Sequence, residues 1–117
     1  MTSPVNLSGK LGQITKHWDP HVVADYNEND VMVVKFQGAF PFHLHANTDD
    51  FFLVLKGEMV MDFQDESHTV KAGEMIVVPQ GVTHRPRAEN ECEVPLIEPK
   101  GEPNTGDPAT AAAKPSL

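Results

Sequence analysis

Apolar residues in the middle of the chain form short runs that are interrupted by glycine, proline or acidic residues. Most of these apolar residues are β-branched, aromatic or methionine, and β-branched and aromatic residues favour strands. The runs lie at residues 31–38, 51–63, 68–81 and 92–99. Strands this short and this regularly spaced predict an all-β sandwich or barrel.

The N-terminal segment shows a weaker, helical pattern. Leu7, Leu11 and Ile14 stand near helical spacing, while two glycines among them oppose a helix. We therefore expect one short helix or turn between residues 5 and 17.

The chain from residue 98 onward is rich in proline and poor in bulky apolar side chains. This composition predicts an irregular or disordered tail, unless the tail lies against another surface. With 117 residues the chain has room for one domain with one core. We divide it into an N-terminal arm at residues 1–30, a barrel at residues 31–99 and a C-terminal tail at residues 100–117.

Residues 51–55 read FFLVL, so both faces of this predicted strand are apolar. A strand with one face in solvent alternates apolar and polar residues instead. One face can fill the barrel, and the other needs cover from the N-terminal segment or from a second subunit. We expect a homodimer.

The net charge of the chain is −8 and its isoelectric point is near 5.0. These values disfavour nucleic acid or an anionic membrane surface as the main partner. The sequence has no signal-peptide pattern, and no apolar stretch approaches the ~20 residues that span a bilayer. We therefore expect a soluble, cytoplasmic protein whose partner is a small molecule.

Cys92 is the only cysteine, which excludes an intrachain disulfide and a cysteine-based zinc site. It alternates with Val94 and Leu96, and this pattern predicts a buried side chain rather than a nucleophile. Any metal site must use His, Asp or Glu.

Two histidines, His43 and His45, stand just before a polar turn that leads to Asp49 and Asp50. On a strand, side chains two positions apart leave the same face, so both imidazoles can point at one spot. On a helix they could not. Taken alone, the pair is typical either of a metal site or of solvated histidines on the rim of a hairpin.

The residues around these histidines resemble the two sequence motifs of the cupin superfamily. The first motif is matched by Gly38, His43, His45, Asp50 and Gly57. Its opening spacing is one residue short, and aspartate stands where glutamate is usual. The second motif is matched by Gly73, Pro79, Gly81 and His84, with Ala88 where asparagine is frequent.

The resemblance implies a double-stranded β-helix, the jelly-roll barrel of cupins, with the motif histidines facing inward. The implied metal ligands are His43, His45, Asp50 and His84. Parity along the strand favours Asp50 over Asp49, which is the fallback ligand. Three imidazoles and one carboxylate suit one divalent ion such as Zn, Ni, Fe or Mn. Asp50 then either binds the ion directly or orients a bound water.

Other chemically active side chains have plainer interpretations. Histidines without a motif are expected on the surface or in packing contacts: His17, His21 and His68. The methionines are expected to fill the core rather than line a pocket: Met32, Met59, Met61 and Met75. Two arginines are expected on a solvated strand edge rather than at an anion site: Arg85 and Arg87. The acids of the tail region are expected only to aid solubility: Glu98, Glu102 and Asp107.

Two classes of function remain open. The first is a metal-dependent enzyme of isomerase or oxygenase type that acts on a small oxygenated or carbonyl compound, with Asp50 also moving a proton. The second is a non-catalytic module that binds or senses a small ligand through the metal. An empty structural barrel is a third alternative. Catalysis needs a second titratable group in the pocket, and the sequence shows no obvious one.

Overall fold

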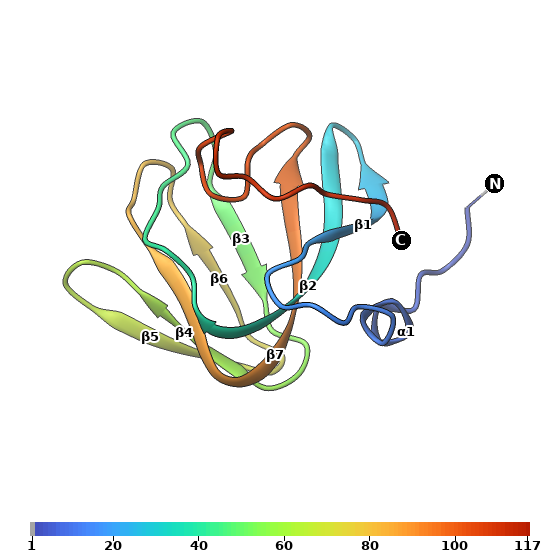
Figure 1. Ribbon diagram of the computed structural model, residues 1–117, viewed down its shortest axis with the longest axis horizontal. Coiled ribbons are helices and arrows are strands. Elements are labelled where there is room, and N and C mark those ends of the chain that lie inside the picture. Colours follow the sequence, from blue (N-terminus) through green and yellow to red (C-terminus); the bar gives the residue numbers. More distant parts are fainter. Residues whose placement is uncertain (1) are drawn as a thin grey trace.

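The computed structural model describes residues 2–117 and shows an almost entirely β fold with one short helix (Figure 1). Helix α1 spans Leu7–Leu11. The strands are β1 (His21–Tyr26), β2 (Asn29–Ala39), β3 (Asp50–Leu53), β4 (Glu58–Asp62), β5 (Ser67–Lys71), β6 (Met75–Val78) and β7 (Arg85–Pro99). The predicted all-β class and the predicted short N-terminal helix are confirmed.

Strand β7 connects the two halves of the fold. The strand order is β1-β2-β7-β3-β6, and β4 pairs with both β5 and β7. The start of β7 pairs with β4 through Arg85 and Asp62, whereas its later residues Leu96 and Ile97 pair with β3. All of these pairings are antiparallel. Because one long strand serves both halves, the sheet curves around a common interior, as the jelly roll requires.

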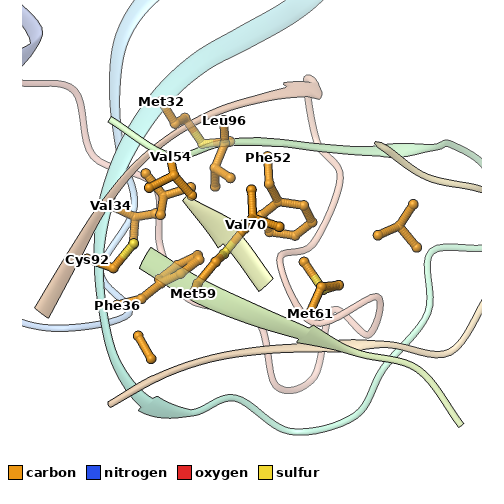
Figure 2. Packing of buried hydrophobic residues seen from close by; sticks show 13 residues of the cluster. Met32, Val34, Phe36, Phe52, Val54, Met59, Met61, Val70, Cys92 and Leu96 are labelled. Carbon is orange, nitrogen blue, oxygen red and sulfur yellow. The ribbon is translucent and has the colours of Figure 1, made fainter. Parts of the chain in front are cut away.

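The interior is filled by apolar side chains from both halves of the barrel. Figure 2 shows these side chains pointing toward one another across the interior. The buried cluster comprises Met32, Val34, Phe36, Phe52, Val54, Met59, Met61, Val70, Val78, Ala88, Cys92, Val94 and Leu96. Three of the four methionines expected in the core lie there. Met75 does not: its residue is 52% exposed on β6, so that prediction was wrong.

The N-terminal segment covers β2 rather than β3. The side chain of Asn6 caps α1 by accepting a hydrogen bond from the backbone N–H of Gly9. Leu11 of the helix and Ile14, which follows the helix, are buried against Val33 on the outer face of β2. The outer face of β3 therefore receives no cover from this segment.

The C-terminal tail has no regular strand or helix, as its composition predicts, but it lies against the barrel (Figure 1). Ser116 forms a parallel bridge with Val22 of β1. The tail also passes beside the segment that carries the two neighbouring histidines, since Gly106 packs on the carbonyl of Leu44. No helix among residues 2–117 is long and apolar enough to cross a membrane.

Candidate metal centre

The structure brings His43, His45, Asp50 and His84 together at one end of the barrel. One possible ligand atom from each residue lies within 4.8 Å of the others. His43 and His84 are held by a backbone bridge, in which each N–H donates to the other's carbonyl at 3.0 and 2.9 Å. Asp50 begins β3, and its side chain is buried. Asp49, the fallback ligand, lies outside the cluster and accepts a hydrogen bond from the backbone of Gln80.

The glycine of the second motif holds the turn that delivers His84. Gly81 has a φ of +80°, which is the left-handed region that side chains rarely adopt. Its N–H donates to the carbonyl of His45 at 2.9 Å. This one residue therefore ties the loop before His84 to the strand segment of His45, and it sets the relative position of the two imidazoles.

Each of the three imidazoles is held by a hydrogen bond at Nδ1, which leaves Nε2 to bind a metal once the ring is neutral. The Nδ1 atoms of His43 and His84 lie 3.0 and 2.9 Å from the carbonyl oxygens of Pro41 and Val82. A carbonyl oxygen can only accept, so Nδ1 of each ring carries the proton. Nδ1 of His45 lies 2.9 Å from a carboxylate oxygen of Glu102, which also accepts. In the neutral rings Nε2 then has a free lone pair, and such outer hydrogen bonds are typical of metal-binding histidines.

Two buried polar atoms of the cluster lack hydrogen-bond partners among the described residues: Nε2 of His45 and Oδ1 of Asp50. Nε2 of His45 lies 3.2 Å from Oδ2 of Asp50, yet it is not aligned for a hydrogen bond. Buried polar groups are nearly always paired, because an unpaired one costs free energy. A cation between these atoms would satisfy both.

The size of the cluster also fits a metal ion. Nitrogen and oxygen ligands bind Zn²⁺ at about 2.0–2.2 Å, so two ligand atoms of one ion lie at most about 4.4 Å apart. The widest separation in the cluster is within 4.8 Å, so only a small contraction is needed. The donor set and the geometry are therefore compatible with one divalent ion.

The protonation of the cluster is set by burial and by the carboxylates. Burial lowers the pKa of His43 to about 4, which keeps this ring neutral. Burial also acts to lower the pKa of His45, but Asp50 and Glu102 outweigh it and raise the value to about 9. Burial acts to raise the pKa of Asp50, and the neighbouring His45 and His84 lower it below its ordinary value on balance. Asp50 is therefore an ionised acceptor.

A cavity of about 40 Å³ lies beside His43. Four aromatic side chains form much of its wall: Trp18, Phe36, Phe40 and Phe52. Trp18 comes from the N-terminal arm and stacks on Phe36 with ring centroids 4.3 Å apart. A cavity of this size has room for a few water molecules. Its polar wall consists of His43 together with Glu98, Asn104 and Lys114.

The prediction that the acids of the tail region only aid solubility was wrong for two of them. Glu98 is 4% exposed and forms an ion pair with Lys114 at 3.0 Å, in the wall of the cavity. Glu102 binds His45, as described above. Asp107 is exposed, as expected. The alternation of buried side chains along a strand could have placed Glu98 in the interior, because Glu98 continues the buried series of Val94 and Leu96 along β7. No local pattern could have placed Glu102.

The predicted environments of the remaining histidines and of Cys92 agree with the structure. Arg85 and Arg87 lie half-exposed and donate to the carboxylate of Asp62 at 2.9 and 2.7 Å, away from the cavity wall. The predicted strand edge was wrong, because Arg87 pairs with Ala39 of β2 on one side and with Val60 of β4 on the other. The histidines outside the motifs make surface or packing contacts: His17, His21 and His68. Burial raises the pKa of Cys92 to about 11, so this thiol stays protonated and is a packing residue.

Comparison with known proteins agrees with this architecture. The sequence matches the family model described as "Cupin domain" over residues 30–97. The chain is similar to the uncharacterised protein YdbB of Bacillus subtilis (strain 168), with 29% identity over 89 residues, which is 75% of this chain and 79% of that protein.

Two crystal structures of bacterial proteins are similar over most of their length. A cupin-2 domain containing protein from Shewanella frigidimarina is 41% identical, with a TM-score of 0.81 over 82% of this chain and 94% of that chain. Protein NMB1881 from Neisseria meningitidis is 36% identical, with a TM-score of 0.77 over 84% of this chain and 100% of that chain. The family match spans more than half of the chain and includes both motifs. The chain belongs to the cupin family.

Proposed function

We propose that His43, His45, Asp50 and His84 bind one divalent metal ion, and that the protein is a metal-dependent enzyme of isomerase or oxygenase type. Its substrate would be a small oxygenated or carbonyl compound. The observation that carries this proposal is the set of three imidazoles with protonated Nδ1 atoms, which direct Nε2 toward one buried carboxylate beside a cavity. The ion would supply Lewis acidity and a template for substrate oxygens.

The chain's own residues would hold the substrate and move its proton. The aromatic wall of the cavity binds the apolar part of a small molecule and excludes water. Asp50 is the acceptor nearest the three imidazoles and is our candidate for proton transfer. Glu98 is the second titratable group that catalysis needs. Burial and the nearby Asp50 raise the pKa of Glu98, an effect that Lys114 opposes.

The metal is one of Zn, Ni, Fe or Mn. Nitrogen-rich sites bind Zn and Ni more tightly than Fe and Mn, so the ion found after aerobic purification can differ from the one used in the cell. Anaerobic purification with metal analysis therefore comes before any assay.

A non-catalytic module that binds or senses a small ligand is the second candidate function. The ion pair between Glu98 and Lys114 favours it, because a carboxylate held by an ammonium group is a weaker proton acceptor. In this case the cavity would bind a ligand without turnover.

A thermal-shift screen of metal-loaded and metal-free protein tests the proposal. Diacids, keto acids and sugar derivatives are suitable ligands, and a ligand that binds at the metal should stabilise only the loaded form. Hits are then incubated with wild type and with Glu98→Gln. The enzyme proposal expects turnover by wild type and a loss of turnover in Glu98→Gln with metal content unchanged. A hit that is bound but never converted would favour the binding module, and hits that do not depend on metal would contradict both.

A further inference from the structure

The last residues of the chain are fastened to the barrel. The backbone of Val22 donates to the carbonyl of Pro115 and accepts from the N–H of Leu117, both at 2.9 Å. The side chain of Leu117 packs against the small core under α1, and Lys10 donates to its carbonyl at 2.9 Å. The C-terminal tail, residues 100–117, is therefore fixed at its far end to β1, and we call this segment the strap.

The middle of this strap lies over the candidate metal centre. Gly106 sits so close to the carbonyl of Leu44, the residue between the two neighbouring histidines, that a Cβ atom at Gly106 would lie 1.9 Å from that oxygen. The ammonium group of Lys114 reaches back to donate to the carboxylate of Glu98 and to the carbonyl of Glu102. Figure 1 shows this red segment crossing the barrel end where β3 begins.

Glu102 makes the contact that joins the strap to the cluster. Its Oε2 accepts from Nδ1 of His45 at 2.9 Å, although the two residues are 57 positions apart. The side chains are 12% and 2% exposed, so water does not screen the contact strongly. A carboxylate in this place fixes which ring nitrogen is protonated, holds the ring in orientation and makes Nε2 more basic. The other two imidazoles receive this support from backbone carbonyls of their own loops.

From these contacts we infer that Glu102 is a positioning residue of the metal centre, and that docking of the strap and metal binding stabilise each other. This inference rests on the proposed metal binding. If the docked strap raises the metal affinity, the bound metal must stabilise the docked strap by the same factor, because linkage is reciprocal. The strap is then a part of the site and not only a cover for it.

A strap with a purely structural role makes a different prediction. Removing Glu102 would then lower the stability of the fold and leave the metal affinity of the folded protein unchanged. The affinity for the ion itself, measured on folded protein, separates the two accounts.

The test compares Zn²⁺ affinity among four proteins by competition with a chromophoric chelator. The variants are Glu102→Ala, Glu102→Gln and the control Asp107→Ala, which removes an exposed tail acid whose carboxylate bonds only within the tail. We expect Glu102→Ala to bind Zn²⁺ about 10–100-fold more weakly. Glu102→Gln should lose less, because its amide oxygen still accepts from Nδ1, and Asp107→Ala should match wild type. If Glu102→Ala does not fold, the isosteric Glu102→Gln decides.

Amide hydrogen exchange of residues 103–117 supplies the reciprocal measurement. Zn²⁺ should slow exchange of this segment in wild type and in Asp107→Ala, and the effect should shrink in Glu102→Ala. If wild type binds Zn²⁺ but both Glu102 variants bind it equally well and the tail exchanges at the same rate with and without metal, the inference is overturned while the proposed function stands. If wild type binds no Zn²⁺, the proposed function fails and the inference fails with it.

Discussion

The carboxylate of Asp50 lies 3.1 Å from Nε2 of His84, a residue that follows it 34 positions later in the chain. Asp50 comes from the first motif and His84 from the second, so this contact is where the two motifs meet. Nε2 of His45 lies 3.2 Å from the same oxygen of Asp50. One buried carboxylate thus faces two imidazoles, and its role can be tested directly.

Asp50→Ala should weaken metal binding by at least about 10–100-fold, and by more if the carboxylate binds the ion directly. Asp49→Ala is the matched control. It loses a hydrogen bond to the backbone of Gln80 and should cost up to about 1 kcal/mol of stability, with the metal affinity unchanged. Titration of both metal-free variants with Zn²⁺ gives the comparison. Loss of the metal in Asp49→Ala but not in Asp50→Ala would move the carboxylate ligand to Asp49.

Asp50→Glu restores the side chain that the cupin motif usually has. Equal or tighter metal binding would mean that the centre has room for direct binding by glutamate. Aspartate and glutamate carry the same charge. Weaker binding would therefore mean that the turn before β3 has already adjusted to the shorter acid. The same titration decides between these outcomes.

Gly81→Val should lower both stability and metal affinity. The added Cβ meets no atom within 4 Å, so the cost comes from the φ of +80°, and a strained residue of this kind costs on the order of 1–3 kcal/mol. Relaxation of the turn would then move His84. Gly73→Val is the control, because its φ is +84° with equally open space, and it lies in the turn between β5 and β6. Both variants should unfold at a lower temperature than wild type, but only Gly81→Val should lose metal affinity. Unchanged affinity in Gly81→Val would refute the role of this turn.

Metal affinity should rise with pH up to about 9. Because Asp50 and Glu102 hold the pKa of His45 at about 9, this ring carries a proton at neutral pH that the metal must displace. Below about pH 9, each decrease of one pH unit should therefore lower the metal affinity about tenfold, because the one proton on His45 competes with the metal ion. Chelator competition between pH 6 and pH 9.5 measures the slope. A flat profile would exclude His45 as a ligand with this pKa.

The stability of the metal-free protein should instead fall as the pH rises. The raised pKa of His45 contributes stability that is fully present below about 6.5, the ordinary histidine value, and that is lost as the pH rises through about 9. Thermal unfolding of metal-free protein should therefore occur at lower temperature at pH 9.5 than at pH 6.5. His45→Gln should reduce this difference, and an unchanged difference would assign it to other groups.

The fold and the centre of the site could be predicted from the sequence because their determinants are local. Short apolar runs located β2 to β6 and the second half of β7, but not its first half, and glycines with positive φ stand at the motif turns. The two motifs then placed four side chains that the structure brings together.

The outer parts of the site could not be predicted, because they depend on contacts between distant segments. Trp18 reaches the cavity from the arm, Lys114 reaches it from the tail, and Glu102 reaches His45 from the same tail, whose composition is typical of disorder. Nothing in their local sequence marks them, and only the path of the folded chain brings them to the site. The prediction that Met75 lies in the core was wrong for another reason. Met75 lies on the outer face of β6, although this strand is as apolar as a core strand.

The exposed apolar face of β3 and β6 still predicts a homodimer. Met75 is 52% and Val77 is 45% exposed, and their neighbours across the strand pair are Leu53 and Phe51. A continuous apolar face of this kind favours an interface with a second copy. Light scattering at micromolar concentration should give a dimer for wild type and a monomer for Val77→Asp. The control Tyr26→Asp, at a side chain that is 60% exposed on β1, should remain dimeric. A monomeric wild type would refute the prediction.

The central claim is that this barrel holds one metal ion through residues of its two motifs. Calorimetric titration of metal-free protein with Zn²⁺ tests it most directly, with wild type beside the double variant His45→Ala/His84→Ala and the surface control His68→Ala. The account predicts one ion per chain for wild type and for His68→Ala, and no binding at the same concentrations for the double variant. Absence of binding by folded wild type, or equal binding by the double variant, would contradict the claim.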